Sequence, residues 1–157
     1  MTSSFKEEAL NKENLSQLYE KDYYLWLEAT RQLLAEGKLT ELDIENLSEE
    51  IADMGRSEKR AIASNLEVLL MHLLKYKYQP AKQTNSWRYT IYEHRKRLKK
   101  AFNESPSLKK YFQQIFDESY QEARKMASIE TGLAIKIFPE VSPFSEEDTL
   151  NDDYLPE

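Results

Sequence analysis

The sequence predicts an all-α protein, and three observations support this. Only 3 Gly and 5 Pro interrupt 157 residues, charged residues make up 32% of the chain, and apolar residues recur at three- and four-residue spacing over four long stretches. Four amphipathic stretches joined by short connectors are most simply buried together in a four-helix bundle. We therefore expect an up-and-down bundle with an irregular C-terminal tail packed on it.

The first predicted helix begins near Asn14 or Ser16, either of which can cap it. It extends to Gly37, which offers a left-handed stop. Its apolar stripe consists of Leu15, Tyr19, Tyr23, Trp26, Leu27, Thr30, Leu33 and Leu34.

The second predicted helix begins at Asp43, a good N-cap, and Pro80 terminates it. Between them lies Gly55, so the sequence is compatible with one long helix that has a local irregularity or with two helices that share a joint. The apolar stripe comprises Ile44, Leu47, Ile51, Met54, Ile62, Leu66, Leu69, Leu70, Leu73 and Leu74.

The third and fourth predicted helices are capped by Asn85 or Ser86 and by Ser105 with Pro106 at the first helical position. Gly132 is the expected end of the fourth. The inner face of the third helix is Trp87, Ile91, His94, Leu98 and Ala101 or Phe102, and its outer face is Arg and Lys. The stripe of the fourth is Leu108, Phe112, Ile115, Phe116, Ala123, Met126 and Ile129.

Three segments follow from this pattern: a flexible arm at 1–13, a helical bundle at 14–132 and a C-terminal wrap at 133–157. In the wrap, Ser145 to Asp148 can cap one short turn of helix. Its expected apolar anchors are Phe138, Phe144, Leu150, Tyr154 and Leu155.

Composition excludes several classes of protein. No cysteine is present, so the chain has no disulfide framework and no thiolate chemistry. The N-terminal residues lack the basic and apolar regions of a signal peptide, and no apolar run approaches the roughly 18 residues that cross a bilayer. We expect a cytoplasmic protein that does not enter the membrane.

The net charge of −6 conceals a strong asymmetry along the chain. Residues 75–110 hold 11 Lys or Arg against 2 Glu, a net charge of +9, which leaves −15 for the remainder. A basic segment inside an acidic frame favours an anionic partner for that segment or ion pairing within the protein.

The densest polar cluster is LDIENLSEEIADMG, in which Glu49 or Glu50 shares a helix face with Asp53. Such a pair of carboxylates could bind a divalent ion or transfer protons. The alternative is a set of surface acids paired with Arg56, Lys59 and Arg60. No cofactor is predicted, and a divalent metal remains a minority interpretation.

His72 lies among leucines in VLLMHLLKYKYQP, where a lone histidine is more often a hydrogen-bonded core residue than a ligand or base. Helical di-metal centres use Glu-x-x-His pairs, and none occurs in this sequence. A single-ion site made by Glu50, Asp53 and His72 is the form of metal site that the sequence leaves open.

The segment SWRYTIYEHRKRLKK combines basic and aromatic side chains, which together can grip phosphates and stack on bases. The alternatives are a solvated cationic face, or a clamp in which Arg88 and Arg95 hold Glu50 and Asp53. The candidate binding residues of this region are Lys75, Trp87, Arg88 and Arg95.

Six blocks of the sequence cover residues 19–156: YEKDYYLWLEATRQLL, LDIENLSEEIADMGRSEKR, LLMHLLKYKYQP, SWRYTIYEHRKRL, SPSLKKYFQQIFDESYQEA and FPEVSPFSEEDTLNDDYLP. Together these blocks are similar to domain-of-unknown-function family 29, which is bacterial and common in cyanobacteria. The resemblance implies a helical protein without an established activity. His94 stands where the family pattern leads us to expect glutamine.

The resemblance places the motif of the family on particular residues of this chain. They are Tyr19, Asp22, Trp26, Leu42, Asp43, Glu49, Glu50, Asp53, Gly55, His72, Lys75, Gln79, Pro80, Ser86, Trp87, Arg88 and Arg95.

Three functions fit the sequence, in descending order of support. The first is a structural or protein-interaction module with a protein partner or self-association, and the second is a nucleic-acid-associated protein that uses residues 75–110. The third is a metal-dependent hydrolytic enzyme built on Glu49, Glu50, Asp53 and His72. Because no recognisable catalytic set occurs, the sequence favours a role other than catalysis.

Overall fold

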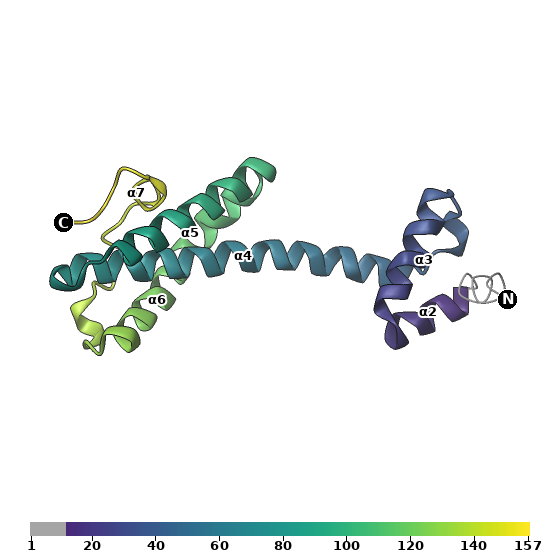
Figure 1. Cartoon of the computed structure of the whole chain (residues 1–157), viewed down its shortest axis with the longest axis horizontal. Coiled ribbons are helices and arrows are strands. Elements are labelled where there is room, and N and C mark those ends of the chain that lie inside the picture. Colours follow the sequence, from purple (N-terminus) through teal and green to yellow (C-terminus); the bar gives the residue numbers. More distant parts are fainter. Residues whose placement is uncertain (1–11) are drawn as a thin grey trace. The chain divides into compact units, whose positions relative to one another are not determined.

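The all-α prediction is confirmed by a computed structural model that describes residues 12–157 (Figure 1). Within that range the chain forms six α-helices and three short 3-10 helices, and no strand occurs. No helix in the same range is both long enough and apolar enough for a bilayer crossing. The predicted arm at 1–13 lies outside the described residues up to position 11.

Contacts divide the chain into two compact units, residues 1–56 and residues 57–157, which we call unit 1 and unit 2. Helix α4 begins in unit 1 and ends in unit 2. The four-helix bundle therefore stays a prediction, and each unit is described by itself.

Unit 1 contains α2 (Lys12–Lys21), α3 (Tyr23–Ala35), the 3-10 helix η1 (Leu39–Glu41) and the first turns of α4. The prediction of one uninterrupted helix before Gly37 was wrong. Asp22 leaves the helical region and its carboxylate accepts a hydrogen bond from the Leu25 amide, so it acts as the N-cap of α3. Gly37 has φ +69°, as a left-handed residue after a helix requires.

The core of unit 1 is small. Its fully or nearly fully buried apolar residues are Leu15, Trp26, Ala29, Leu33 and Leu42. Leu18, Tyr19 and Leu47 pack against them and remain partly exposed. Only one residue of α4, Leu47, thus takes part in this cluster.

Helix α4 (Ile44–Tyr78) is one continuous helix of 35 residues. It begins directly after Asp43, whose carboxylate accepts from the Asn46 amide, as predicted for a cap. Gly55 lies inside the helix and has no positive φ, so it does not break the helix into two. Every residue from 51 to 60 is exposed.

Pro80 follows the end of α4, as predicted, and opens the 3-10 helix η2 (Pro80–Lys82). Helix α5 (Asn85–Glu104) is capped by Thr84 and not by Asn85 or Ser86, because the Thr84 hydroxyl accepts from the Trp87 amide. The predicted cationic outer face needs one correction: Arg95 is buried.

Helix α6 (Leu108–Thr131) starts two residues later than predicted, since Ser105 closes α5 and Pro106 lies in the turn between the helices. Gly132, with φ +73°, ends α6 as expected. Ile129 was predicted on the inner stripe but is 83% exposed.

The core of unit 2 joins α4 from Ile62 onward, α5, α6 and the C-terminal segment. This segment contains η3 (Ile135–Ile137) and α7 (Glu146–Leu150), which Ser145 caps through the Asp148 amide. Phe138 and Phe144 are buried in that core, and Leu150 and Tyr154 pack against it. Leu155, the fifth expected anchor, is exposed.

Candidate functional site

A carboxylate held by two tyrosines joins the helices of unit 1. Tyr19 on α2 donates from its hydroxyl to Oε1 of Glu50, and Tyr23 on α3 donates to Oε2, each at 2.5 Å. Because both oxygens of Glu50 are bound, this side chain connects α2 and α3 to the beginning of α4. The hydrogen bond from each phenol stabilises its protonated form, which raises the pKa of Tyr19 to about 12 and also raises the pKa of Tyr23.

Aromatic packing strengthens the same cluster. The rings of Tyr19 and Trp26 meet edge to face with centroids 4.9 Å apart, and Tyr23 stacks on Trp26 at 6.1 Å. The buried indole nitrogen of Trp26 donates to Oδ2 of Asp43 at 3.2 Å, and Asn46 donates to the same oxygen at 2.7 Å. Two hydrogen bonds, Tyr23 to Glu50 and Trp26 to Asp43, therefore fix α3 against the start of α4.

The remaining acids of the predicted cluster pair with an arginine. Arg56 donates to Glu49 at 2.7 Å and also to Asp53, and all three side chains are about half exposed. Together with the two tyrosines on Glu50, this arrangement accounts for every carboxylate of the proposed metal site. Within residues 12–157, no group of three or more His, Asp or Glu side chains has the placement of a metal site.

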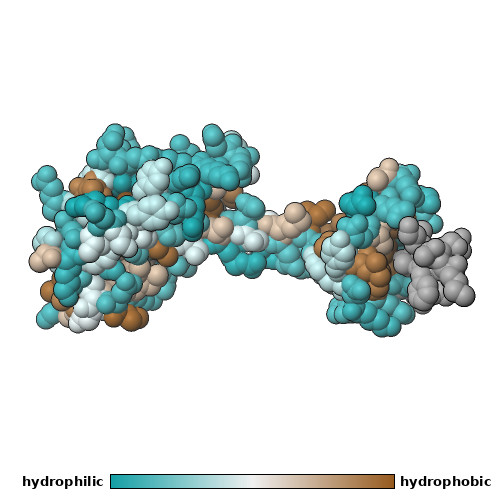
Figure 2. All heavy atoms as spheres, viewed as in Figure 1, coloured by the Kyte–Doolittle hydropathy of each residue, from teal (hydrophilic) through white to brown (hydrophobic). Residues whose placement is uncertain are grey.

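Many apolar side chains of unit 1 are exposed. In Figure 2, hydrophobic residues, drawn brown, reach the surface on unit 1 among hydrophilic ones. Among the described residues, nine large apolar residues of unit 1 are exposed and five apolar residues, Ala29 among them, are buried, whereas unit 2 has seven large apolar residues exposed and seventeen apolar residues buried. We call the nine the unit 1 apolar surface: Tyr23, Tyr24, Leu25, Leu27, Leu34, Leu39, Ile44, Ile51 and Met54.

His72 lies in unit 2, where it is half-buried and its Nδ1 donates to the Val68 carbonyl at 2.9 Å. Burial lowers the pKa of its imidazole, as it does for His94, whose Nδ1 donates to Asn65 at 2.8 Å. The structure gives His72 none of the predicted acidic ligands as a hydrogen-bond partner. Its contacts are those of a core histidine.

Lys75 and Trp87, two of the predicted binding residues, lie together. The Lys75 ammonium is 4.5 Å from the centroid of the Trp87 ring and donates to Glu130 on α6 at 2.5 Å. Only 5% of Lys75 is exposed, so this cation is held inside unit 2 between an aromatic face and a carboxylate. The three residues connect α4, α5 and α6.

Arg88 and Arg95 do not share a site. Arg88 donates to the Tyr76 hydroxyl at 3.2 Å and to Asn85 at 2.6 Å, whereas Arg95 donates to the carbonyl oxygens of Thr149 and Asp148. Burial lowers the pKa of the Arg95 guanidinium. Arg95 therefore anchors the C-terminal segment. Because its side chain is buried, it is not available to bind a ligand at the surface.

The exposed face of α5 combines aromatic and cationic side chains. Tyr89 and Tyr92 are 63% and 51% exposed, and Lys96 and Lys100 continue the same helix face at helical spacing. No ion pair is recorded for either lysine within the described residues. Lys99 lies at the edge of this face and pairs with Asp152 at 2.9 Å.

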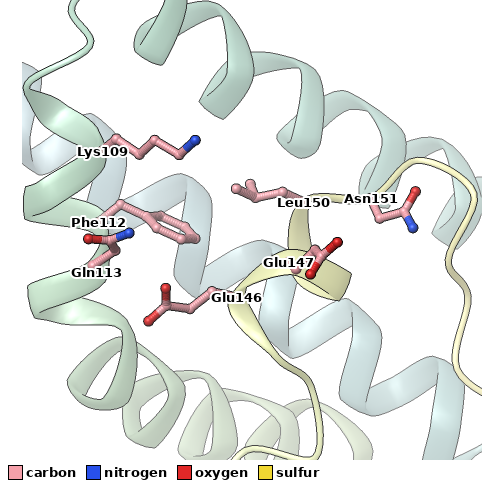
Figure 3. Close-up of a pocket in the computed structure, with 7 residues that line it drawn as sticks. All are labelled: Lys109, Phe112, Gln113, Glu146, Glu147, Leu150 and Asn151. Carbon is pink, nitrogen blue, oxygen red and sulfur yellow. The ribbon is translucent and has the colours of Figure 1, made fainter.

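Shallow hollows adjoin this face between α5, α6 and α7. One of them, of about 560 Å³, is lined by Lys109, Phe112 and Gln113 of α6 and by residues of α7, as Figure 3 shows. It shares Lys109 and Leu150 with a second hollow, which in turn shares Lys99 and Asn103 with a third. The acids Glu146, Glu147 and Asp152 line the same hollows, so their positive charge is interrupted.

For several of these residues, the sequence did not predict which partner they contact. Asp43 was predicted only as a helix cap, yet it also accepts from the Trp26 indole 17 residues away. Glu130, the partner of Lys75, had no sequence signal that distinguished it from other acids. The family-like motif did include Tyr19, Trp26, Asp43 and Glu50, and this was the one signal that grouped them.

Over residues 12–157 the fold is all-helical, and several of the motif side chains, among them Tyr19, Glu50 and Arg95, connect different helices. The chain belongs to the family described as Domain of unknown function DUF29, which it matches over residues 18–155. Neither the search of curated proteins nor the search of solved structures found a match.

Proposed function

We propose that the protein is a protein-interaction module and that unit 1 carries its binding surface. The observation that supports this proposal is that nine large apolar residues are exposed in the described part of unit 1, whereas five apolar residues, Ala29 among them, are buried. Exposed apolar side chains that gather on one part of a protein are typical of surfaces that bind other proteins. A unit with so small a core gains stability from a partner that covers its surface.

The part of this surface on α4 has the pattern of a helix-packing face. Ile44, Ile51 and Met54 are 57%, 62% and 67% exposed and share one face of the helix with Leu47. Of these four residues, Leu47 is the one that packs on the unit 1 core. Covering one of the exposed side chains would contribute about 1–2 kcal/mol, since they are roughly two-thirds exposed.

The scaffold behind this face is rigid enough to present it. Glu50 and Asp43, which neighbour the face in the sequence, are bound by Tyr19, Tyr23 and Trp26. These hydrogen bonds hold α2 and α3 on the start of α4, so less conformational entropy is lost when a partner binds.

A site-specific crosslinking experiment tests the proposal. A photo-reactive phenylalanine analogue replaces Met54 in one variant and Ile129 in another, since both are exposed apolar residues on helices. Illumination in native cells should give a discrete crosslinked species from position 54 that a second substitution, Ile51→Ser, removes. Equal crosslinking from position 129, or a species that survives Ile51→Ser, would contradict an interface on unit 1.

A second candidate function, association with single-stranded nucleic acid, is favoured by the face of α5. Tyr89, Tyr92, Lys96 and Lys100 follow one another on that face, with both aromatic rings exposed. Exposed rings can stack on bases while lysines contact the phosphates. The overall charge of −6 and the acids of α7 oppose such binding.

Fluorescence anisotropy with a labelled 20-residue oligothymidylate at low salt tests this second function. The double variant Lys96→Gln, Lys100→Gln should lose about tenfold in affinity, because phosphate contacts dominate binding of this kind. The control is Lys125→Gln, which removes an exposed lysine of α6 that pairs with Glu122. No binding at low ionic strength, or the same loss in the control, would end the nucleic-acid hypothesis.

A further inference from the structure

We infer that the partner of unit 1 is a basic amphipathic helix of another protein, which packs alongside α4 on Ile44, Ile51 and Met54. This inference rests on the proposed function and adds the chemistry of the partner. It follows from the spacing of the exposed residues, from the charge around them and from the length of the stripe.

The spacing fits a partner helix. Ile44, Leu47, Ile51 and Met54 are separated by three, four and three residues, which is the alternation of the a and d positions in a heptad repeat. Residues at a and d form the seam that accepts knobs from a facing helix in left-handed packing. Leu47 packs on the unit 1 core, whereas every residue of α4 from 51 to 60 is exposed, so the seam is open to a partner helix at Ile51 and Met54.

The charge around the seam selects a basic partner. Residues 12–56 contain 11 Asp or Glu against 5 Lys or Arg, a net charge of −6. Three of the five cations, Arg31, Lys38 and Arg56, are already paired with acids of unit 1. Glu41 and Glu45, which flank Ile44 in the sequence, have no ion pair recorded in the described part of the chain and remain for a partner's cations.

The same charge disfavours two other occupants. A second copy that used the same seam would bring together two segments 12–56 that each carry −6. An anionic membrane surface would repel the net negative charge of residues 12–56, whereas helices that lie on membranes are rich in Lys and Arg. A helix with lysines or arginines beside its apolar stripe matches the apolar residues of the seam and the negative charge of residues 12–56.

The length of the stripe sets the size of the ligand. From Ile44 to Met54 the rise is about 15 Å at roughly 1.5 Å per residue, which is nearly three helical turns. A partner segment must therefore present three or four apolar residues at i, i+3 or i+4 and i+7. Isolated helices of this length are marginal in water, so we expect the segment to become helical on binding.

Two synthetic peptides test the inference on the full-length protein. Both are fluorescein-labelled 18-residue sequences with leucine at the a and d positions. They differ in the charged residue that stands at the positions beside this stripe, which is lysine in one peptide and glutamate in the other. Anisotropy should show the lysine peptide binding at least about tenfold more tightly than the glutamate peptide in low salt, with a smaller ratio in high salt. Circular dichroism should show helix gained on binding.

Matched variants connect the binding to the seam. Ile51→Ser with Met54→Ser keeps the charge of unit 1 and should weaken the lysine peptide about tenfold, and Glu41→Gln with Glu45→Gln should weaken it several-fold. The control, Ile129→Ser with Val141→Ser, changes two apolar residues of unit 2 that are more than four-fifths exposed and should have little effect. All of these residues are exposed or half-exposed, so the fold should persist.

Each outcome decides between the inference and the function on which it rests. If both peptides bind equally and both need Ile51 and Met54, unit 1 binds helices but the partner is not selected for positive charge. If neither peptide depends on these two residues, the interface on unit 1 is wrong as well. If the wild-type protein sediments as a dimer that Ile51→Ser with Met54→Ser dissociates, the seam belongs to a second copy and the inference is overturned.

Discussion

Arg95 on α5 donates from Nε to the carbonyl oxygen of Thr149 at 2.8 Å and from Nη2 to that of Asp148 at 3.1 Å. The side chain is 2% exposed, and both carbonyls lie in the last turn of α7. Carbonyl groups at a helix C-terminus have no partner within the helix. A buried guanidinium thus completes the hydrogen bonding of α7 and holds the C-terminal segment on unit 2.

Replacement of Arg95 by methionine should therefore destabilise unit 2 and release α7. The variant keeps an apolar stem but leaves the Thr149 carbonyl without its donor, whereas the Asp148 carbonyl keeps the Asn151 amide, so the cost should be about 1–3 kcal/mol. Urea unfolding measures the loss, and limited proteolysis should show earlier cleavage after position 140. Arg97→Met is the control, because Arg97 is exposed and its ion pair is with Glu93 on the same helix, so its removal should cost less than about 1 kcal/mol. Equal losses would contradict the anchoring role.

The hydrogen bond to Glu50 should govern the ionisation of Tyr19. In wild-type protein the pKa of Tyr19 is raised to about 12, chiefly by this bond, and Glu50→Gln should bring it back toward 10. Carbon-13 NMR of the tyrosine ζ carbons measures both values. A Tyr19 signal that titrates near pH 10 in the wild-type protein would disprove the carboxylate contact.

The same shift predicts how stability depends on alkaline pH. Below pH 10 the phenol is protonated in the folded and unfolded states, so its full contribution is present. Between pH 10 and about 12 the unfolded chain loses the proton while the folded Tyr19 keeps it, so the free energy of unfolding falls as pH rises. The fall should be smaller in Glu50→Gln, and denaturant unfolding at pH 9 and pH 11 compares the two proteins.

Gly55→Ala should stabilise α4. Gly55 lies inside the helix, and a Cβ added there would meet no atom within 4 Å. Alanine in a helix interior is favoured over glycine by about 1 kcal/mol, so both the helical signal in circular dichroism and the melting temperature should rise.

Gly132→Ala provides the matched control for this prediction. Gly132 is equally unobstructed but has φ +73°, which an alanine adopts with strain. The control should therefore lose about 1 kcal/mol where Gly55→Ala gains it. A loss at both positions would show that α4 needs a flexible residue at Gly55.

The two partners of the Lys75–Glu130 ion pair should respond differently to removal. Glu130 is about half exposed, whereas Lys75 is buried against Trp87. Glu130→Gln leaves a buried ammonium without its counter-charge and should cost about 1–2 kcal/mol after allowance for solvent screening. Lys75→Met removes the charge, keeps an apolar contact with the indole ring and should cost less. Chemical unfolding of both variants and of the double variant measures the difference, and a larger loss in Lys75→Met would refute it.

Local signals explain which parts of the fold were predictable. Asp43, Pro80, Gly132 and Ser145 act on atoms within a few residues of themselves, and the structure places helix boundaries at all four. The misplaced starts of α5 and α6 differ by one or two residues, because Thr84, Asn85 and Ser86 are all acceptable caps. The break at Asp22 was missed because the apolar spacing continues across it.

The candidate site was less predictable than the fold. Sequence spacing grouped Glu49 and Asp53 on one face of α4, and the structure shows them sharing Arg56. It could not show that Glu50 accepts from tyrosines 27 and 31 residues away. Contacts over such separations depend on how α2 and α3 fold back on α4, which no local pattern specifies.

By itself the sequence determined that this protein is helical and where most of its helices end, because propensity, capping and periodicity act over one or two turns. Only the tertiary structure decided which apolar stripes are covered. Helix α4 shows this, because its apolar residues recur at similar spacing throughout, yet Ile62 and Leu66 are buried in a core whereas Ile51 and Met54 are exposed. The tertiary structure alone also decided that Arg95 and Lys75 are buried, since the burial of a helix face depends on what packs against it.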